Sequence, residues 1–177
     1  MLKRKKFRTL KSSKFCTFND LYKKQPHVEC VQFKLEEQMI FTNSDGGSRG
    51  NPGPGAIGVI VRDDEKILTQ YSAKIGKFVT NNIAEYEALI KALELASRFT
   101  NEELTCVLDS ELVVNQLLGK YKVKNQYLLP LFLKVQKLQE NFKKIKYVHV
   151  HREDKFQILA DELLNNEMDK EYGKRRY

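Results

Sequence analysis

The chain has 177 residues and a mass of 20.7 kDa, which suits one well-buried domain and is short for two. Hydrophobic residues make up 41% and charged residues 31%, a composition typical of a globular protein and unlike that of a disordered chain. The formal net charge of +8 favours a polyanionic partner, either nucleic acid or an anionic membrane surface.

This positive charge is concentrated at the two ends of the chain. Residues 1–39 carry ten basic and four acidic side chains, residues 170–177 carry four and one, and the residues between them carry 17 and 18. The run KRKKFRTLKSSK has neither helix nor strand periodicity. Residues 1–37 are therefore predicted to be a basic extension, which is either a flexible solvated tail, an arm that binds phosphates or a targeting signal. Residues 38–169 are the predicted folded domain, and residues 170–177 a basic tail.

The cysteines and apolar runs predict a cytoplasmic protein without a membrane partner. The chain has three cysteines, Cys16, Cys30 and Cys106. An odd number of cysteines without metal-ligand spacing favours reduced thiols. The apolar run over residues 128–133 is too short to cross a bilayer, and no apolar stretch follows the basic N-terminus as it would in a signal peptide. No feature indicates an obligate protein partner, so a monomer is expected.

From residue 39 onward, the hydrophobic pattern predicts a series of strands and helices. Residues 39–44 are expected to form a strand and residues 45–55 (DGGSRGNPGPG) a turn-rich stretch without regular structure. Residues 56–62 and 66–74 are then expected to pair as a hairpin. The remaining predicted elements are a helix over 82–98, a buried strand over 104–109, helices over 110–118 and 127–142, a strand over 146–150 and a helix over 158–168. This order predicts an α/β fold with a mixed sheet and helices packed on it.

Three aspartates stand out by their positions near the ends of these elements. Asp45 follows the first strand, where it could be an ordinary turn residue. Asp109 ends a buried strand directly before a helix, a place that suits either a ligand site or a helix N-cap. Asp161 lies near the start of the last helix, where a negative charge is favourable without any further role.

Glu85 is the fourth acid, and helix geometry separates it from Glu87. Positions 85, 89, 92 and 96 share one face, which is otherwise apolar, whereas positions 87, 91, 94 and 98 form a charged face. An unpaired carboxylate on an apolar face is costly, and a bound metal ion would justify it. Because four acids converge on one predicted sheet edge, a shared functional site is favoured over four separate local structural roles.

Four segments, taken in order, resemble the type 1 ribonuclease H family over about residues 39–169. They are DGGSRGNPGPG, TNNIAEYEAL, LDSELVVNQL and VHREDKFQILADELLN. The stretch GKYKVKN followed by a proline-containing helix is most similar to the compact archaeal and bacterial form of the family. The resemblance covers none of residues 1–37.

The resemblance implies a ribonuclease H-like fold with a five-stranded sheet in the order 3-2-1-4-5, whose first three strands are antiparallel. It also implies a metal-dependent endonuclease that hydrolyses the RNA strand of RNA–DNA hybrids and leaves 5′-phosphate and 3′-hydroxyl ends. The family's metal-binding carboxylates carry over to Asp45, Glu85, Asp109 and Asp161. Two Mg²⁺ ions, or Mn²⁺ in their place, held ~3.5–4 Å apart would share Asp45 and clamp the attacking and leaving oxygens.

The resemblance further assigns residues that would bind the hybrid or help product leave. Readout of the RNA 2′-hydroxyl is expected from the backbone of Gly46, Gly47 and Ser48 and from the side chains of Asn51, Asn81, Glu85 and Glu111. Thr80 and Asn82 are expected to contact a DNA phosphate, although Asn81 and Asn82 also suit helix capping. His151 has the spacing from Asp161 expected of a catalytic histidine, whereas His149 fits the compact members' pattern. Lys120, Lys122 and Lys124 would contact the hybrid or form a solvated turn.

Two other functions compete with this interpretation. A nuclease with a different substrate could use the same fold, because a fold does not determine a function. A non-catalytic module could instead bind nucleic acid through the basic ends and show salt-dependent binding without hydrolysis.

Overall fold

The computed structural model describes residues 39–172. The predicted N-terminal extension lies outside the described residues, as do residues 173–177 of the predicted C-terminal tail. The proposed division of the chain into an extension, a domain and a tail therefore stays a prediction. Within residues 39–172, none of the helices combines the length and apolar character needed to cross a membrane.

The described part of the chain contains strands and helices in the predicted order βββαβααβα. They are β1 (Ile40–Ser48), β2 (Gly53–Arg62), β3 (Ile67–Val79), α1 (Asn81–Ala96), β4 (Glu103–Leu108), α2 (Glu111–Leu117), α3 (Leu129–Gln139), β5 (Lys144–His149) and α4 (Lys155–Tyr172).

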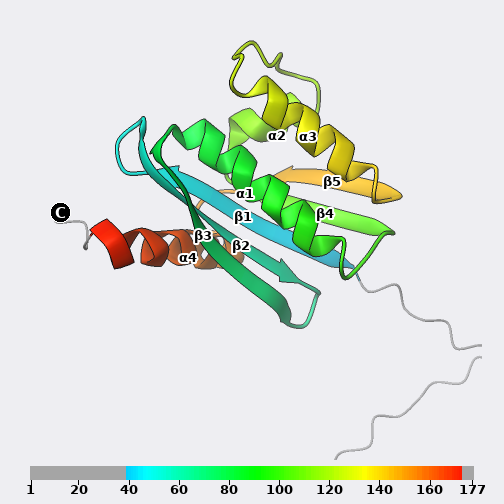
Figure 1. Cartoon of the computed structure of the whole chain (residues 1–177). Coiled ribbons are helices and arrows are strands. Elements are labelled where there is room, and N and C mark those ends of the chain that lie inside the picture. The colour runs from blue at the N-terminus through cyan, green and yellow to red at the C-terminus, as the bar shows by residue number, and fades with distance from the viewer. Residues whose placement is uncertain (1–38, 173–177) are drawn as a thin grey trace, which may run out of the picture. The chain divides into compact units, whose positions relative to one another are not determined.

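The strands form one sheet in the order β3-β2-β1-β4-β5, which confirms the predicted topology (Figure 1). β1 and β2 pair antiparallel, as do β2 and β3, whereas β4 is parallel to both β1 and β5. The carboxyl ends of β1 and β4 therefore lie at the same edge of the sheet, where open α/β sheets place ligands.

Helices cover both faces of the sheet, and α4 lies on the face opposite α1 and α3 (Figure 1). The main core lies between the sheet and helices α1 to α3, and it includes Val59 and Val61 of β2 and Leu89 and Leu93 of α1. A smaller core joins α4 to β2 through Ala56, Leu164 and Met168. Because side chains of a strand alternate between faces, β2 contributes to both cores.

The glycine-rich stretch over residues 45–55 is more regular than the sequence predicted. β1 continues through Ser48 and β2 begins at Gly53, so only residues 49–52 connect the two strands. Gly46 pairs with Ile57 and Gly47 with Ala56, which shows that the glycines belong to the ladder. The prediction of an irregular stretch was wrong because cross-strand pairing outweighs the weak strand preference of glycine. Asp45 consequently lies within a strand and not in a turn.

Two glycines explain how close the helices come to the sheet. A Cβ atom on Gly46 would lie 2.1 Å from the Ala84 carbonyl oxygen of α1, and one on Gly58 would lie 2.0 Å from the Ala160 carbonyl oxygen of α4. Real side chains cannot approach backbone so closely, so only glycine lets each helix lie at these distances. Gly46 thus brings Glu85 to the sheet from one face, and Gly58 brings Asp161 from the other.

The other elements differ from the predicted ones chiefly at their ends. β3 continues to Val79 instead of ending at residue 74, and α4 begins at Lys155 instead of residue 158. The extension of β3 follows from strand pairing, since Gly53 pairs with Val79. The earlier start of α4 follows from a local cap, because the side chain of Asp154 accepts the Gln157 amide at 3.1 Å. Hydrophobic periodicity reports neither the pairing nor the cap.

Candidate active site

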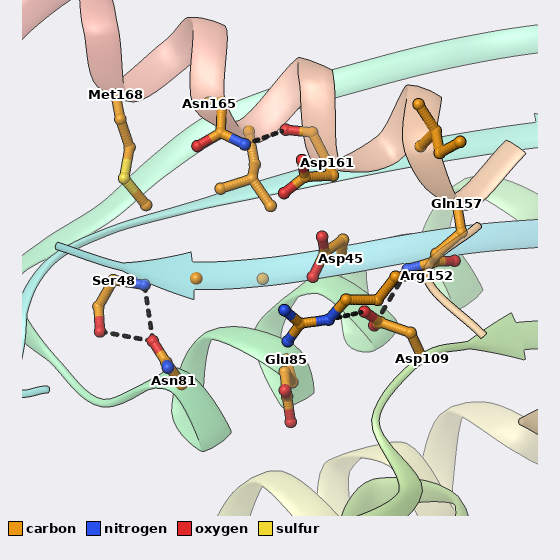
Figure 2. Close-up of a pocket in the computed structure, with 14 residues that line it drawn as sticks. Asp45, Ser48, Asn81, Glu85, Asp109, Arg152, Gln157, Asp161, Asn165 and Met168 are labelled. Atoms are coloured by element: carbon orange, nitrogen blue, oxygen red, sulfur yellow. Dashed lines mark hydrogen bonds and ion pairs between the residues drawn. The ribbon is translucent and has the colours of Figure 1, made fainter. Parts of the chain in front are cut away.

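A polar pocket of about 350 Å³ opens at the sheet edge where β1 and β4 end (Figure 2). It is lined by residues of β1, α1, the β4–α2 junction, the loop after β5, and α4: Asp45, Gly46, Gly47, Ser48, Asn81, Glu85, Asp109, Arg152, Gln157, Ile158, Asp161, Leu164, Asn165 and Met168. All four predicted carboxylates are among these residues. Figure 2 shows Asp45 between Asp161 on one side and Glu85 and Asp109 on the other.

The structure excludes the local structural roles that the sequence offered for the three aspartates. Asp45 lies within β1 and is not a turn residue. The N-cap of α2 is Ser110, whose side chain accepts the Val113 amide, so Asp109 is not the cap. Asp161 lies beyond the first turn of α4, and that first turn contains no acidic residue. None of the three therefore serves the local purpose that its sequence context suggested.

Glu85 lies as helix geometry predicted, on the face of α1 shared with buried Leu89, Ala92 and Ala96. Its carboxylate accepts a short hydrogen bond from the Ser110 hydroxyl, which ties α1 to the start of α2. Burial raises the pKa of Glu85, and repulsion from Asp109 adds to this, while the Ser110 hydrogen bond and Arg152 oppose it.

Asp109 is held by two neighbours, one on each carboxylate oxygen. Its Oδ2 lies 3.3 Å from Nε of Arg152, and its Oδ1 accepts a hydrogen bond from Nε2 of Gln157 at 3.2 Å (Figure 2). The Arg152 side chain is 90% exposed, whereas Gln157 is 1% exposed. The arginine can therefore swing away from the pocket, and the glutamine cannot.

Asn81 and Ser48 form the far end of the pocket. Oδ1 of Asn81 accepts hydrogen bonds from the Ser48 amide at 2.9 Å and the Ser48 hydroxyl at 2.8 Å (Figure 2). The expectation that Asn81 or Asn82 caps α1 was wrong, because the N-cap is Thr80, whose hydroxyl accepts the Ile83 amide at 3.4 Å.

The remaining predicted contacts do not line the pocket. Asn51 accepts the Asn81 backbone amide at 3.2 Å, and Glu111 accepts the Asn115 side-chain amide at 3.3 Å. His149 ends β5 and His151 lies in the loop after it; their ring centroids are 6.1 Å apart, and both residues are exposed. The assigned roles of these residues, and of Thr80 and Asn82, stay predictions.

The four carboxylates make the pocket strongly unfavourable for further negative charge. Burial raises the pKa of Asp45 from 3.8 to about 8, and repulsion from Asp109, Asp161 and Glu85 contributes to the rise. Asp45 therefore holds a proton at neutral pH when no cation is bound. A bound cation would reverse the balance and favour the ionised carboxylate.

The donor set fits a divalent cation of the Mg²⁺ type. The four carboxylates and the neighbouring amide groups offer oxygen atoms, which are the hard ligands that Mg²⁺ prefers. Across residues 39–172, no three His, Cys, Asp or Glu side chains already stand close enough together to enclose an ion. Mg²⁺ does not need such a cage, because it commonly uses one or two carboxylates together with waters and substrate phosphates.

Sequence reasoning missed several residues that build the site. Gln157 precedes Asp161 by four positions and so shares its helix face, a spacing that could have identified it. Arg152 and Ser110 gave no comparable signal, because their contacts with Asp109 and Glu85 join segments far apart in the chain. Gly58 also gave none, since its role depends on the approach of α4.

Comparisons with known proteins agree with this fold. Residues 43–161 match the family described as reverse transcriptase-like. A bifunctional protein of Mycobacterium tuberculosis is 40% identical over 132 residues, which is 73% of this chain and 35% of that protein. The ribonuclease HI of Halobacterium salinarum is 39% identical over 125 residues, which is 69% of this chain and 62% of the enzyme. The matched part of the chain thus corresponds to about a third of the mycobacterial protein and to less than two thirds of the archaeal enzyme.

Among solved structures, LC11-RNase H1 in complex with an RNA/DNA hybrid matches with a TM-score of 0.69 and 42% identity, over 74% of this chain and 97% of that one. The sheet order, the acidic pocket and the family match together define a ribonuclease H-like protein. The chain belongs to the type 1 ribonuclease H family.

Proposed function

We propose that this protein is a ribonuclease H that hydrolyses the RNA strand of RNA–DNA hybrids and leaves 5′-phosphate and 3′-hydroxyl ends. The observation that carries the proposal is the convergence of Asp45, Glu85, Asp109 and Asp161 on one pocket from separate elements on both faces of the sheet. The hybrid bound by the LC11 enzyme supports the same substrate class here. A monomeric, cytoplasmic protein is part of this proposal.

In the proposed mechanism, Asp45, Glu85, Asp109 and Asp161 would hold two divalent ions, Mg²⁺ or Mn²⁺. Such ions would supply activation of the attacking water and charge stabilisation at the leaving oxygen of an in-line displacement. The chain's own residues supply the geometry. Ser110 orients Glu85, Gly46 lets α1 lie close to β1, and Asn81 holds the Ser48 amide at the end where the RNA strand would lie. Arg152 keeps a positive charge beside Asp109 until substrate arrives.

Labelled RNA–DNA hybrid, duplex RNA, single-stranded RNA and duplex DNA, incubated side by side with and without Mg²⁺, test the activity. We expect metal-dependent cleavage of the RNA in the hybrid, with products that a kinase labels only after phosphatase treatment. Cleavage of another substrate in preference to the hybrid would favour a different nuclease, and salt-dependent binding without cleavage would favour a binding module.

Asp45→Asn and Asp109→Asn test the assignment of the site. Each change removes a charged ligand that contributes several kcal/mol to transition-state stabilisation, so we expect kcat to fall about 1,000-fold or more. Asp64→Asn, an exposed residue of the β2–β3 turn, is the matched control. Wild-type cleavage by either pocket variant, with circular dichroism showing the same fold, would refute the proposal.

A further inference from the structure

Gln157 is the one pocket residue with a buried amide side chain, and it contacts two of the elements that carry the carboxylates. Its Nε2 donates to the Ser44 carbonyl oxygen at 3.0 Å and to Oδ1 of Asp109 at 3.2 Å. Ser44 directly precedes Asp45 in β1, and Asp161 lies one helical turn after Gln157 in α4. One side chain is therefore joined to the positions of three of the four acids.

Chemistry determines which way this amide faces. The Ser44 carbonyl and the Asp109 carboxylate can only accept hydrogen bonds, so the NH₂ group must face them and the oxygen must face away. Oε1 of Gln157 is buried, and none of the described residues donates to it. An unpaired buried acceptor is unfavourable. The side chain therefore donates hydrogen bonds to the Ser44 carbonyl and the Asp109 carboxylate while its own oxygen stays without a donor among the described residues.

The main chain around Gln157 is held as firmly as its side chain. Oδ1 of Asp154 accepts the amides of Phe156 at 3.0 Å and Gln157 at 3.1 Å, and it also accepts Nδ2 of Asn43 in β1 at 3.4 Å. The Phe156 ring lies against the Arg62 guanidinium, whose central carbon is 4.2 Å from the ring centroid. The first turn of α4 is thus attached to both β1 and β2.

The two carboxylate oxygens of Asp109 consequently differ in how firmly their partners are held. Oδ1 is held by buried Gln157, whereas Oδ2 faces the exposed and displaceable Arg152. Holding one oxygen fixes the carboxylate plane and leaves the other oxygen able to accept a cation. Residues that orient a metal ligand in this way commonly contribute 10–100-fold to metal affinity or activity.

We propose that Gln157 is a positioning residue that presents Oδ2 of Asp109 to a divalent cation and keeps Asp109 in register with Asp45. The inference rests on the proposed function for the identity of the reaction. Gln157 does not itself contact the reacting atoms in this role. Its loss is therefore expected to weaken metal binding and turnover and to leave hybrid binding unchanged.

Gln157→Met tests the inference, since it keeps the length of the side chain and removes the amide. Calorimetric titration of the full chain with Mn²⁺, without nucleic acid, should show about 10-fold weaker binding than the wild type. With hybrid, kcat should fall about 10–100-fold at a fixed subsaturating Mg²⁺ concentration, with the KM for hybrid within about twofold of wild type.

Gln116→Met is the matched control, because Gln116 is also a buried glutamine and its Oε1 accepts the Tyr86 hydroxyl at 2.7 Å, away from the pocket. It should lower the Tm by a few degrees and leave Mn²⁺ affinity and kcat as in wild type. Equal Mn²⁺ affinity and equal kcat in Gln157→Met and wild type would overturn the inference, as would equal effects of the two methionine variants.

The experiment also distinguishes misfolding of Gln157→Met from failure of the proposed function. If Gln157→Met does not fold, Gln157→Asn replaces it, because its amide falls one methylene short of the two acceptors and the same loss of Mn²⁺ affinity is expected. If the wild type fails to cleave hybrids, the proposed function is wrong, whereas the Mn²⁺ affinities still decide the role of Gln157.

Discussion

The carboxyl group of Asp45 is partly buried in β1 and faces three other acids across the pocket. Burial and this repulsion raise its pKa from 3.8 to about 8. In the unfolded chain the group has its ordinary pKa, so between about pH 4 and pH 8 the folded state binds a proton that the unfolded state does not. The free energy of unfolding of the metal-free protein must therefore fall as pH rises through this window.

Asp45→Asn should make the metal-free protein more stable at high pH. The variant cannot ionise, so in EDTA its Tm should exceed that of the wild type at pH 9, and the difference should shrink towards pH 5. Thermal unfolding followed by circular dichroism at both pH values measures this. Asp64→Asn controls for the loss of one negative charge outside the pocket. A Tm difference that does not change with pH would contradict the raised pKa of Asp45.

At the scale of secondary-structure elements, the site depends on how closely α1 and α4 approach the sheet. Each approach passes over a glycine, Gly46 for α1 and Gly58 for α4. Asp161 reaches the pocket only because α4 lies directly over β2, and Glu85 only because α1 lies directly over β1. The distances between the acids are thus set by backbone contacts outside the acids themselves.

Gly58→Ala should separate α4 from β2 and displace Asp161. The added Cβ would lie 2.0 Å from the Ala160 carbonyl oxygen, so the helix must move. We expect about 1–3 kcal/mol of destabilisation in urea unfolding and, for a displacement near 1 Å, a fall in hybrid cleavage of about 100-fold.

Gln70→Ala, an exposed change in the neighbouring strand β3, is its control and should leave both quantities unchanged. If Gly58→Ala keeps wild-type stability and activity, the contact between α4 and β2 does not position the site.

At the scale of the whole molecule, charge is divided between the domain and its ends. Residues 40–169 carry 17 basic and 18 acidic side chains, so the folded domain has almost no net charge and an acidic pocket. The basic excess lies in residues 1–39 and 170–177. Contacts with nucleic-acid phosphates are therefore expected to come in large part from the ends of the chain.

Deleting residues 1–37 should weaken hybrid binding and make its salt dependence shallower. The segment includes the basic residues 3–6, Arg8, Lys11 and Lys14. The slope of log K against log salt should decrease by about 0.9 for each phosphate that the shortened protein no longer neutralises. Binding measured by fluorescence anisotropy in Ca²⁺ at several salt concentrations tests this, and a full-length variant with the same seven residues changed to Gln should behave like the deletion. An unchanged slope would refute the role of the extension.

The sequence determined the order of elements through local patterns, whereas the sheet order and the shared role of the four acids were implied by its resemblance to the ribonuclease H family. Period-2 and period-3.6 patterns identify strands and helices, and helix geometry places Glu85 but not Glu87 on the buried face of α1. The motifs around Asp45, Asp109 and Asp161 are contiguous in the chain, so they are visible without a structure.

Only the tertiary structure decided how those acids are held. The hydrogen bonds of Gln157 to Asp109 and of Ser110 to Glu85 join residues 48 and 25 positions apart, and the contact of Gly58 with Ala160 joins two separate elements. No local pattern encodes such contacts, because they depend on how strands pair and how closely helices pack. The extension of β1 and β2 through the glycine-rich stretch has the same origin, since each strand is stabilised by its partner.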